Sequence, residues 1–351
     1  MNNKFDKRLA TIPSEIITKI ARIDELKGRW IGGLQLNPQA LGRLKRSVLV
    51  TSTGSSTRIE GAKLSDEEVE KLMMGVKTKR FADRDAQEVQ GYFDLLQNLF
   101  DSWKTIKFSE NTIKHFHNEL VKHVDKDQRH RGDYKKVENT VEMFDRSGKS
   151  LGIVFQPTKA YLTPKEMQEL MEWTEAAFVQ KKYHPLLIIG NFLVEFLKVH
   201  PFQDGNGRLS RILTNLLLLK EGYLFVPYVS HEKLIEDNKN DYYLALRRRQ
   251  TTFGKKKEDI VPWLDYFLDI VLRQSEMAIG LLETEDVEKL LSPKQLVIWK
   301  YIQDKGEAAP LEISRETKIA KPTVIQALNR LMKLGKIERI GMGRGTRYRK
   351  R

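Results

Sequence analysis

The sequence lacks cysteine altogether among its 351 residues. This absence excludes disulfide bonds, zinc sites built on thiolates and a cysteine nucleophile. Long apolar runs are also lacking: the run at residues 186–197 is interrupted by Gly190, Asn191 and Glu195 and is shorter than the roughly 18 residues that a membrane-spanning helix needs. The first ten residues carry no apolar stretch of the kind found in secretory signal peptides. These absences predict a soluble, cytoplasmic protein that has no membrane partner.

The positive charge is concentrated near the C-terminus. The whole chain has a net charge of +14, and residues 287–351 hold 16 Lys and Arg against 6 Asp and Glu, a surplus of ten. A basic segment of this kind is typical of proteins that bind nucleic acid. A solvated surface without a nucleic-acid partner is the alternative.

Apolar residues spaced three and four apart predict that the chain is mainly helical. One segment departs from this pattern, because residues 136–140 and 151–156 are β-prone and flank a turn-rich stretch at 145–149, which predicts a β-hairpin. Residues 282–290 are expected to form a polar linker or a short helix. The expected helices cover residues 16–26, 41–51, 85–103, 111–124, 164–179, 185–198, 209–220, 238–250 and 262–281.

The C-terminal residues have the pattern of a winged helix-turn-helix. Helices are predicted at 293–302, 311–317 and 321–334, and a strand, a glycine turn and a second strand at 336–340, 341–345 and 346–350. The third helix would face the DNA major groove and the wing would contact phosphates. The alternative is a module that binds only proteins. The candidate DNA contacts are Lys321, Thr323, Gln326 and Arg330 on the helix, and Arg344 and Arg347 on the wing.

The segment HPFQDGNGRLSR at residues 200–211 joins two apolar helices and carries the strongest chemical signal. His200 titrates near neutrality and could remove a proton from a hydroxyl group. Asp204 offers a hard oxygen ligand suited to Mg²⁺. The glycines let backbone N–H groups approach phosphates at a helix N-terminus, and the two arginines, three residues apart, could bind phosphate oxygens together. The candidate phosphate-binding residues are Gly205, Asn206, Gly207, Arg208 and Arg211.

This segment resembles the HPFx(D/E)GNGRxxR motif of Fic-domain proteins, with every fixed position filled. The resemblance extends over about residues 30–275 and implies a Fic helical bundle with a β-hairpin flap. It also implies a protein adenylyltransferase that moves AMP from ATP, with Mg²⁺, to Ser, Thr or Tyr hydroxyls of target proteins and of itself, releasing pyrophosphate. The flap would hold the target by strand addition, with Val154 among its contacts. Tyr242 and Tyr243 resemble a tyrosine pair that lines the nucleoside pocket, although Gln250 stands where some relatives have Asn.

Residues 56–61 resemble a second motif of the same family, the (S/T)xxxE(G/N) pattern of its inhibitory helix. The resemblance implies that Glu60, with Ser56 one helical turn earlier, pairs with Arg211 and excludes the γ-phosphate from its productive position. Two other readings remain open for the chain. One is a DNA-binding regulator whose Fic core only senses a nucleotide, and the other is an enzyme that removes AMP, in which Glu60 orients a water molecule.

These observations together predict a mainly α protein with three regions. They are an N-terminal helical region at 1–90 that contains the inhibitory helix at about 50–62, a Fic catalytic core at 91–280, and a winged helix-turn-helix at 287–351. A homodimer is left open. The spacing of four histidines suits no common zinc motif, so surface or packing positions are expected for His115, His117, His123 and His130.

Overall fold

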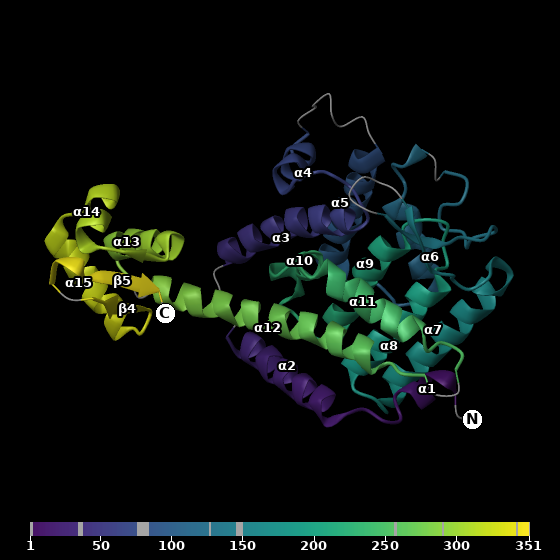
Figure 1. Cartoon of the computed structure of the whole chain (residues 1–351). Helices are drawn as coiled ribbons and strands as arrows, with labels where there is room; N and C mark the ends of the chain where they lie inside the picture. Colours follow the sequence, from purple (N-terminus) through teal and green to yellow (C-terminus); the bar gives the residue numbers. More distant parts are fainter. Residues whose placement is uncertain are drawn as a thin grey trace. The chain divides into compact units, whose positions relative to one another are not determined.

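The computed structural model describes residues 3–33, 38–75, 84–125, 128–144, 150–255, 258–289, 291–341 and 343–350, with side chains at 141–154, 283–289 and 344 left aside. The chain forms two compact units, residues 1–279 and 280–351. Helices dominate both units (Figure 1). The mainly helical fold predicted from the sequence is therefore confirmed.

Two buried helices, α8 (Pro185–Val199) and α9 (Asn206–Lys220), form the centre of the larger unit (Figure 1). Helix α8 is apolar on nearly all sides, as expected of a helix that is surrounded by others. Helix α9 is also buried, but among its leucines it carries polar residues such as Arg208 and Arg211. The core therefore brings charged groups into its interior at the start of α9.

Among the described residues, ten further helices surround this pair or extend from it. Helix α4 begins after Ser65, which caps it in a capping box with Glu68. The helices are α1 (Lys4–Arg8), α2 (Ser14–Gly32), α3 (Pro38–Ile59), α4 (Asp66–Met73), α5 (Arg84–Ser102), α6 (Glu110–Leu120), α7 (Thr163–Gln180), α10 (His231–Asp237), α11 (Lys239–Gln250) and α12 (Val261–Lys289), with short 3₁₀ turns at Ala160–Leu162 and Val226–Tyr228.

A two-stranded antiparallel hairpin, β1 (Val141–Phe144) and β2 (Ser150–Phe155), precedes α7 in the chain, with Val141 opposite Phe155. The prediction of a strand at 136–140 is wrong. Residues in this segment and directly before it bond to the loop between α8 and α9 instead of to a strand. The backbone N–H of Lys135 donates to the carbonyl of Pro201 at 2.8 Å, and the Asn139 amide donates to the carbonyl of Phe202 at 3.0 Å. The turn predicted at 145–149 lies outside the described residues.

The smaller unit has the order helix, strand, helix, helix, strand, strand. Its elements are α13 (Pro293–Lys305), β3 (Glu307–Ala308), α14 (Pro310–Thr317), α15 (Lys321–Lys333), β4 (Ile337–Ile340), a 3₁₀ turn (Gly343–Gly345) and β5 (Arg347–Lys350), with the sheet order β3-β5-β4. Trp299, Leu328 and Tyr348 belong to a core that joins the helices to the sheet. This arrangement is the winged helix predicted from the sequence.

Two expectations about boundaries differ from the structure. Helix α12 continues to Lys289 through the stretch expected to be a linker or short helix, because residues 281–289 contain neither glycine nor proline and glutamate favours helix. The boundary expected after residue 90 lies inside α5, which runs unbroken through it. Within the described ranges, every helix is too short or too polar to cross a lipid bilayer.

Candidate active site

The loop between α8 and α9 turns into the left-handed region at both ends. His200 has φ of +50° and Gly205 has φ of +76°. The N–H of His200 donates to the carbonyl of Phe196 at 2.9 Å and so completes the end of α8. Glycine adopts this conformation freely, whereas it is strained for histidine, and such strain is concentrated at functional sites. The backbone conformation of the loop therefore fixes the position of His200 and the start of α9.

Asn206 closes this loop from within. Its Oδ1 accepts from the N–H of Phe202 at 2.9 Å, and its Nδ2 donates to the carbonyl of the same residue at 2.8 Å. The side chain is almost fully buried. The side-chain amide of Asn206, which was predicted to contact phosphate, therefore bonds within the loop. The backbone N–H of Asn206, at the first position of α9, is the group left to face an anion.

His117, on α6, supports the same loop from outside. Its ring stacks on Phe202 with centroids 3.9 Å apart and an interplanar angle of 7°. Its Nδ1 accepts from the N–H of Gly132 at 2.9 Å, so Nε2 carries the proton and donates to the carbonyl of Asp204 at 3.2 Å. The packing role expected for this histidine is therefore combined with a polar one, because it fixes the backbone beside the predicted metal ligand.

The segment that leads into the hairpin also holds the loop. The ammonium of Lys135 donates to the carbonyl of Val199 at 3.1 Å and to Asn139 Oδ1 at 2.8 Å. Burial lowers the pKa of Lys135 to about 8, against the raising effect of Glu138 and Glu166. These contacts tie the base of the hairpin to His200 and its neighbours.

His200 itself is half-buried and has one ring nitrogen engaged. Its Nδ1 lies 3.3 Å from the carbonyl oxygen of Leu197. A carbonyl can only accept, so Nδ1 carries the proton and Nε2 keeps its lone pair. Burial, followed by the charge of Lys135, lowers the pKa of His200 to about 4. The imidazole is therefore neutral at physiological pH and able to accept a proton at Nε2.

Glu60 lies directly on the start of α9. Its Oε1 accepts from Arg211 Nη2 at 2.8 Å, and Arg211 also donates to Ser56 through Nε to Oγ at 2.8 Å and through Nη2 to the carbonyl at 2.9 Å. A Cβ built on Gly207 would stand 2.2 Å from Glu60 Oε1. The carboxylate thus fills the space that the missing side chain of Gly207 leaves open, and the structure brings together Ser56, Glu60, Gly207 and Arg211.

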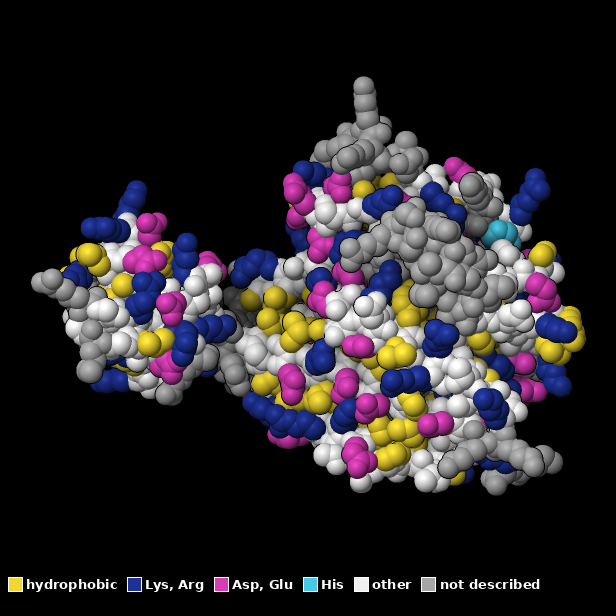
Figure 2. All heavy atoms as spheres, viewed as in Figure 1, with side chains coloured by type: hydrophobic (Ala, Val, Ile, Leu, Met, Phe, Trp, Pro, Cys, Tyr) yellow, Lys and Arg dark blue, Asp and Glu magenta, His cyan; other side chains and the backbone are white. Residues whose placement is uncertain are grey.

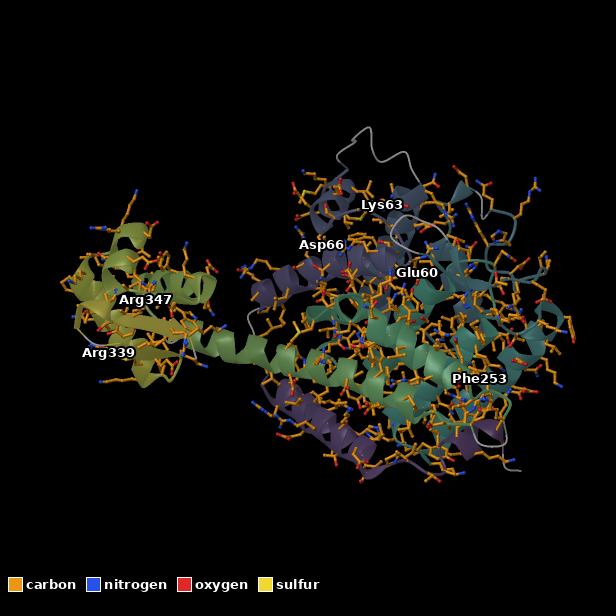
Figure 3. The ribbon with its side chains drawn as sticks, in the orientation of Figure 1. Glu60, Lys63, Asp66, Phe253, Arg339 and Arg347 are labelled. Atoms are coloured by element: carbon orange, nitrogen blue, oxygen red, sulfur yellow. The ribbon has the colours of Figure 1, made fainter. Side chains whose placement is uncertain are left out.

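The helix that ends beside Glu60 is anchored along its length. Glu60 follows Ile59, the last residue of α3, at the inner end of that helix (Figure 3). On α3, Arg58 Nε pairs with Glu236 Oε1 of α10 at 2.6 Å, and Ser52 Oγ donates to Ser230 Oγ at 2.8 Å. These contacts hold the end of α3 in place against α10.

Arg208 and Arg211 do not share one partner, although their spacing predicted a common phosphate site. Arg208 Nη1 pairs with Glu88 Oε2 of α5 at 2.7 Å, and its Nη2 lies 3.4 Å from Asp204 Oδ1. Both guanidinium groups are almost fully buried. Each buried charge has acidic partners, because an unpaired buried charge is costly: Glu88 and Asp204 for Arg208, and Glu60 for Arg211.

Asp204 fits the metal that the resemblance implies. Burial raises the pKa of Asp204, but the Arg208 charge, the Gly205 N–H and the Arg84 charge outweigh this effect, so its pKa lies below its usual value. The group is thus an ionised hard-oxygen donor beside the helix start. Within the described part of the chain, no group of three His, Cys, Asp or Glu side chains could hold a metal ion. One carboxylate suits Mg²⁺ that arrives with a nucleotide and keeps water ligands.

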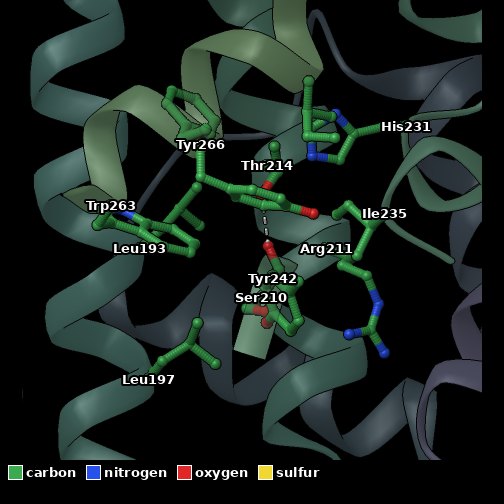
Figure 4. Close-up of a pocket in the computed structure, with 12 residues that line it drawn as sticks. Leu193, Leu197, Ser210, Arg211, Thr214, His231, Ile235, Tyr242, Trp263 and Tyr266 are labelled. Atoms are coloured by element: carbon green, nitrogen blue, oxygen red, sulfur yellow. Dashed lines mark hydrogen bonds between the residues drawn. The ribbon is translucent and has the colours of Figure 1, made fainter. Parts of the chain in front are cut away.

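The two predicted tyrosines lie side by side, with ring centroids 5.2 Å apart, and differ in their other partners. Tyr242 is buried in an aromatic cluster with Trp263 and Tyr266, at ring-centroid distances of 6.2 and 5.9 Å. The cluster lines a cavity of about 20 Å³, from which the Arg211 guanidinium turns away (Figure 4). This volume suits one water molecule and not a nucleoside. Tyr243 instead lies beside the end of α3, with its hydroxyl donating to the carbonyl of Ile59 at 3.4 Å.

For the hairpin that was predicted to bind the target, the structure describes only the backbone at residues 141–144 and 150–154. Val154 belongs to β2, and the next residue, Phe155, packs its ring against Phe253 with centroids 6.3 Å apart. Phe253 in turn lies under the Arg249 guanidinium, 4.1 Å from it, in the larger unit (Figure 3). The end of β2 is therefore attached to the loop after α11.

Helix α15 of the smaller unit has one buried and one exposed face. Val324, Ala327, Leu328 and Leu331 are buried. On the face of the smaller unit that Figure 2 shows, Lys and Arg side chains are interspersed with Asp and Glu side chains. Of the predicted DNA contacts on this helix, Lys321, Gln326 and Arg330 are exposed and Thr323 is half-buried.

Arg347, one of the two predicted DNA contacts on the wing, is engaged in ion pairs. Arg347 on β5 pairs through Nε with Glu307 at 3.0 Å and through Nη2 with Glu312 at 3.2 Å. Arg339 and Arg347 lie on neighbouring strands (Figure 3). Arg344 lies in the 3₁₀ turn between the strands, and its side chain is outside the described set. Arg347 therefore stabilises the packing of β5 on β3 and α14 in this structure.

Comparisons with known proteins find family matches in both units. Residues 107–218 match the Fic/DOC family, and residues 291–338 match a family described as winged helix-turn-helix DNA-binding. A solved Fic family protein from Desulfovibrio desulfuricans has a similar fold, with a TM-score of 0.63, 23% identity and coverage of 97% of both chains. The fold and the site thus define a Fic-fold protein that carries a winged helix.

A curated relative that the chain covers over most of its length shows the family. A Fido domain-containing protein from Dictyostelium discoideum is 33% identical over 114 residues, which are 30% of this chain and 72% of that protein. A probable protein adenylyltransferase from Aquifex aeolicus is 37% identical over 87 residues, 24% of this chain and 25% of that protein. The chain belongs to the Fic/DOC family. The second relative is named as a probable protein adenylyltransferase, and the chain spans about a quarter of its length.

Proposed function

We propose that the protein transfers AMP from ATP to a hydroxyl side chain of a target protein, and of itself, and that Glu60 keeps this activity low. The observation that carries the proposal is the Glu60 carboxylate seated on Gly207 and paired with Arg211. Phosphates bind at glycine-containing helix starts because backbone N–H groups and the helix dipole favour an anion there. A carboxylate already in that place excludes a phosphate from it.

The neutral His200 supplies the base for the reaction. Its Nε2 accepts the proton of a Ser, Thr or Tyr hydroxyl while the hydroxyl oxygen bonds to the α-phosphorus. The bond from that phosphorus to the bridging oxygen breaks, and pyrophosphate leaves. Bound Mg²⁺ would supply neutralisation of phosphate charge, and Asp204 would hold it. The Nδ1 contact to Leu197 keeps the ring in the required tautomer.

Binding of the target relies on the hairpin backbone. A strand of the target would add to the edge of the hairpin through main-chain hydrogen bonds, with Val154 among the contacts. The bonds from Lys135 and Asn139 to the catalytic loop tie the base of this hairpin to His200. An added strand would therefore be aligned with the base that acts on its side chain.

The assay for this proposal uses ATP labelled at the α-phosphate and the full chain. Glu60→Gly is expected to raise label transfer to protein by about tenfold or more, and Glu60→Gly with His200→Ala is expected to abolish it. Glu67→Gly, which removes an exposed carboxylate of α4, is the control and should behave as the original chain. Equal labelling with and without His200 would overturn the assignment of the base.

The same assay separates the two other readings. An absence of transfer by Glu60→Gly, together with nucleotide binding, would favour a core that only senses nucleotide. Loss of label from a pre-modified target that requires Glu60 would favour removal of AMP.

We also infer that the smaller unit contacts DNA. The family match at residues 291–338 and the exposed Lys321, Gln326 and Arg330 on α15 support this inference. Gel shifts with duplex DNA over a salt series test it, because phosphate contacts are strongest at low salt. An absence of retardation at low salt would exclude it.

A further inference from the structure

The carboxylate of Asp204 is already paired with a guanidinium from a distant helix. Arg84, the first residue of α5, contacts Asp204 Oδ2 through its Nη2. The other oxygen, Oδ1, accepts from the N–H of Gly205 at 2.6 Å and lies 3.4 Å from Arg208 Nη2. Both oxygens of the predicted metal ligand therefore have donors in this structure.

Glu88 fixes the positions of both arginines that reach Asp204. Its Oε1 accepts from Arg84 Nε at 2.7 Å, and its Oε2 pairs with Arg208 Nη1 at 2.7 Å. Arg84 and Glu88 are one turn apart on α5, a spacing that brings two side chains together. Because Glu88 is 8% exposed, it holds the Arg84 guanidinium against Asp204 from the protein side.

A guanidinium and a metal ion compete for the same oxygen. Mg²⁺ binds carboxylate oxygens at about 2.0–2.1 Å and requires a nearly ideal octahedral shell. A guanidinium nitrogen in contact with Asp204 Oδ2 occupies one direction of approach. We propose that Arg84 acts as an internal cation that competes with the metal for Asp204, as a second restraint on the site. This inference rests on the proposed function.

The two restraints are complementary in charge. Glu60 occupies the anion site on α9, and Arg84 occupies the cation site on Asp204, so the chain's own side chains stand in for the phosphate and the metal of a metal–nucleotide complex. The Arg84 and Asp204 side chains are 49% and 40% exposed, and pairs screened by water in this way are weak. Arg84 therefore raises the metal concentration that the site needs without closing it.

The test measures ADP affinity by titration calorimetry in Mg²⁺ and again in EDTA, in the Glu60→Gly background. The ratio of the two affinities is the coupling between metal and nucleotide. Arg84→Gln is expected to increase this ratio by about two- to fivefold, the range of a partly exposed ion pair, and to leave affinity in EDTA unchanged. Asp204→Asn should remove the coupling with or without Arg84.

Arg22→Gln, which removes an exposed arginine paired with Glu25 on α2, is the matched control for the lost charge. An unchanged ratio for Arg84→Gln would overturn the inference, and a decreased ratio would do so as well, since Arg84 would then assist binding. ADP contains no transferable AMP–pyrophosphate bond, so this result is independent of transfer. Absence of AMP transfer with an increased ratio would therefore refute the proposed function alone.

Discussion

The side-chain amide of Asn206 binds both the N–H and the carbonyl of Phe202, at 2.9 and 2.8 Å. One side chain thereby closes the whole turn between α8 and α9, and its conformation sets the positions of His200 and Asp204. The loop is held by these two bonds together with the contacts of His117, Lys135 and Asn139.

Replacing Asn206 should destabilise the protein as well as the site. Asn206→Ala removes both bonds and leaves the buried N–H and carbonyl of Phe202 without them, so the free energy of unfolding is expected to fall by about 2 kcal/mol. Urea unfolding measures the change. Asn206→Asp, which keeps an acceptor for the N–H, should lose less. Equal stability of Asn206→Ala and the original chain would contradict this account of the loop.

Removal of the Ser56 hydroxyl should release inhibition in part. Ser56 Oγ accepts from Arg211 Nε at 2.8 Å, and Ser56→Ala leaves Arg211 with Glu60 and the Ser56 carbonyl. Label transfer by Ser56→Ala is therefore expected between that of the original chain and that of Glu60→Gly. Ser52→Ala, one turn earlier and bonded to Ser230, is the control. Transfer by Ser56→Ala no higher than by Ser52→Ala would show that the hydroxyl does not contribute.

Acid should destabilise the larger unit through His231. Burial lowers the pKa of His231 below its usual 6.5, so the unfolded chain takes up a proton first as the pH falls. Stability is therefore complete above pH 6.5 and decreases below it, at a rate of about 1.4 kcal/mol per pH unit for one proton. Urea unfolding between pH 7 and 5 should show a smaller decrease for His231→Gln. His115→Gln, on the exposed face of α6, should match the original chain, and identical slopes for all three would refute the prediction.

DNA binding should depend more on α15 than on β5. Arg330 is exposed, whereas Arg347 is paired with Glu307 and Glu312. Fluorescence anisotropy with duplex DNA should show that Arg330→Ala reduces the salt dependence by about one phosphate contact. Arg347→Ala should keep that slope and lower the thermal stability of the smaller unit. The reverse pattern would assign the phosphate contact to the wing.

The fold was largely predictable because its helices follow apolar periodicity and the winged helix has a regular order of elements. The first hairpin strand was not, since residues 136–140 are β-prone but Lys135 and Asn139 bond to the loop between α8 and α9. Local propensity cannot report a partner that lies far away in the sequence. The same holds for α10 (His231–Asp237), a short helix for which no periodic pattern predicted a start or an end.

The candidate active site was predictable where its residues are contiguous in the sequence. The segment 200–211 carries its own chemistry, but the groups that position it come from elsewhere: Glu88, His117, Lys135 and Asn139. No local signal marked them, because a lone glutamate or histidine on a helix resembles any surface residue. Arg208 and Arg211 were expected to act together on phosphate, and in this structure they pair with different acidic residues.

The anchorage of α3 determines how Glu60 can leave Arg211. Arg58, two residues earlier, is bound to Glu236 and to the carbonyl of Leu64, so the helix end cannot swing away without breaking these bonds. Gly61 directly after Glu60 has φ of +105°, where a side chain would be strained. In the proposed function, release of Glu60 from Arg211 would therefore need rotation only in the peptide units around Gly61, the one corner that an activating partner would have to contact.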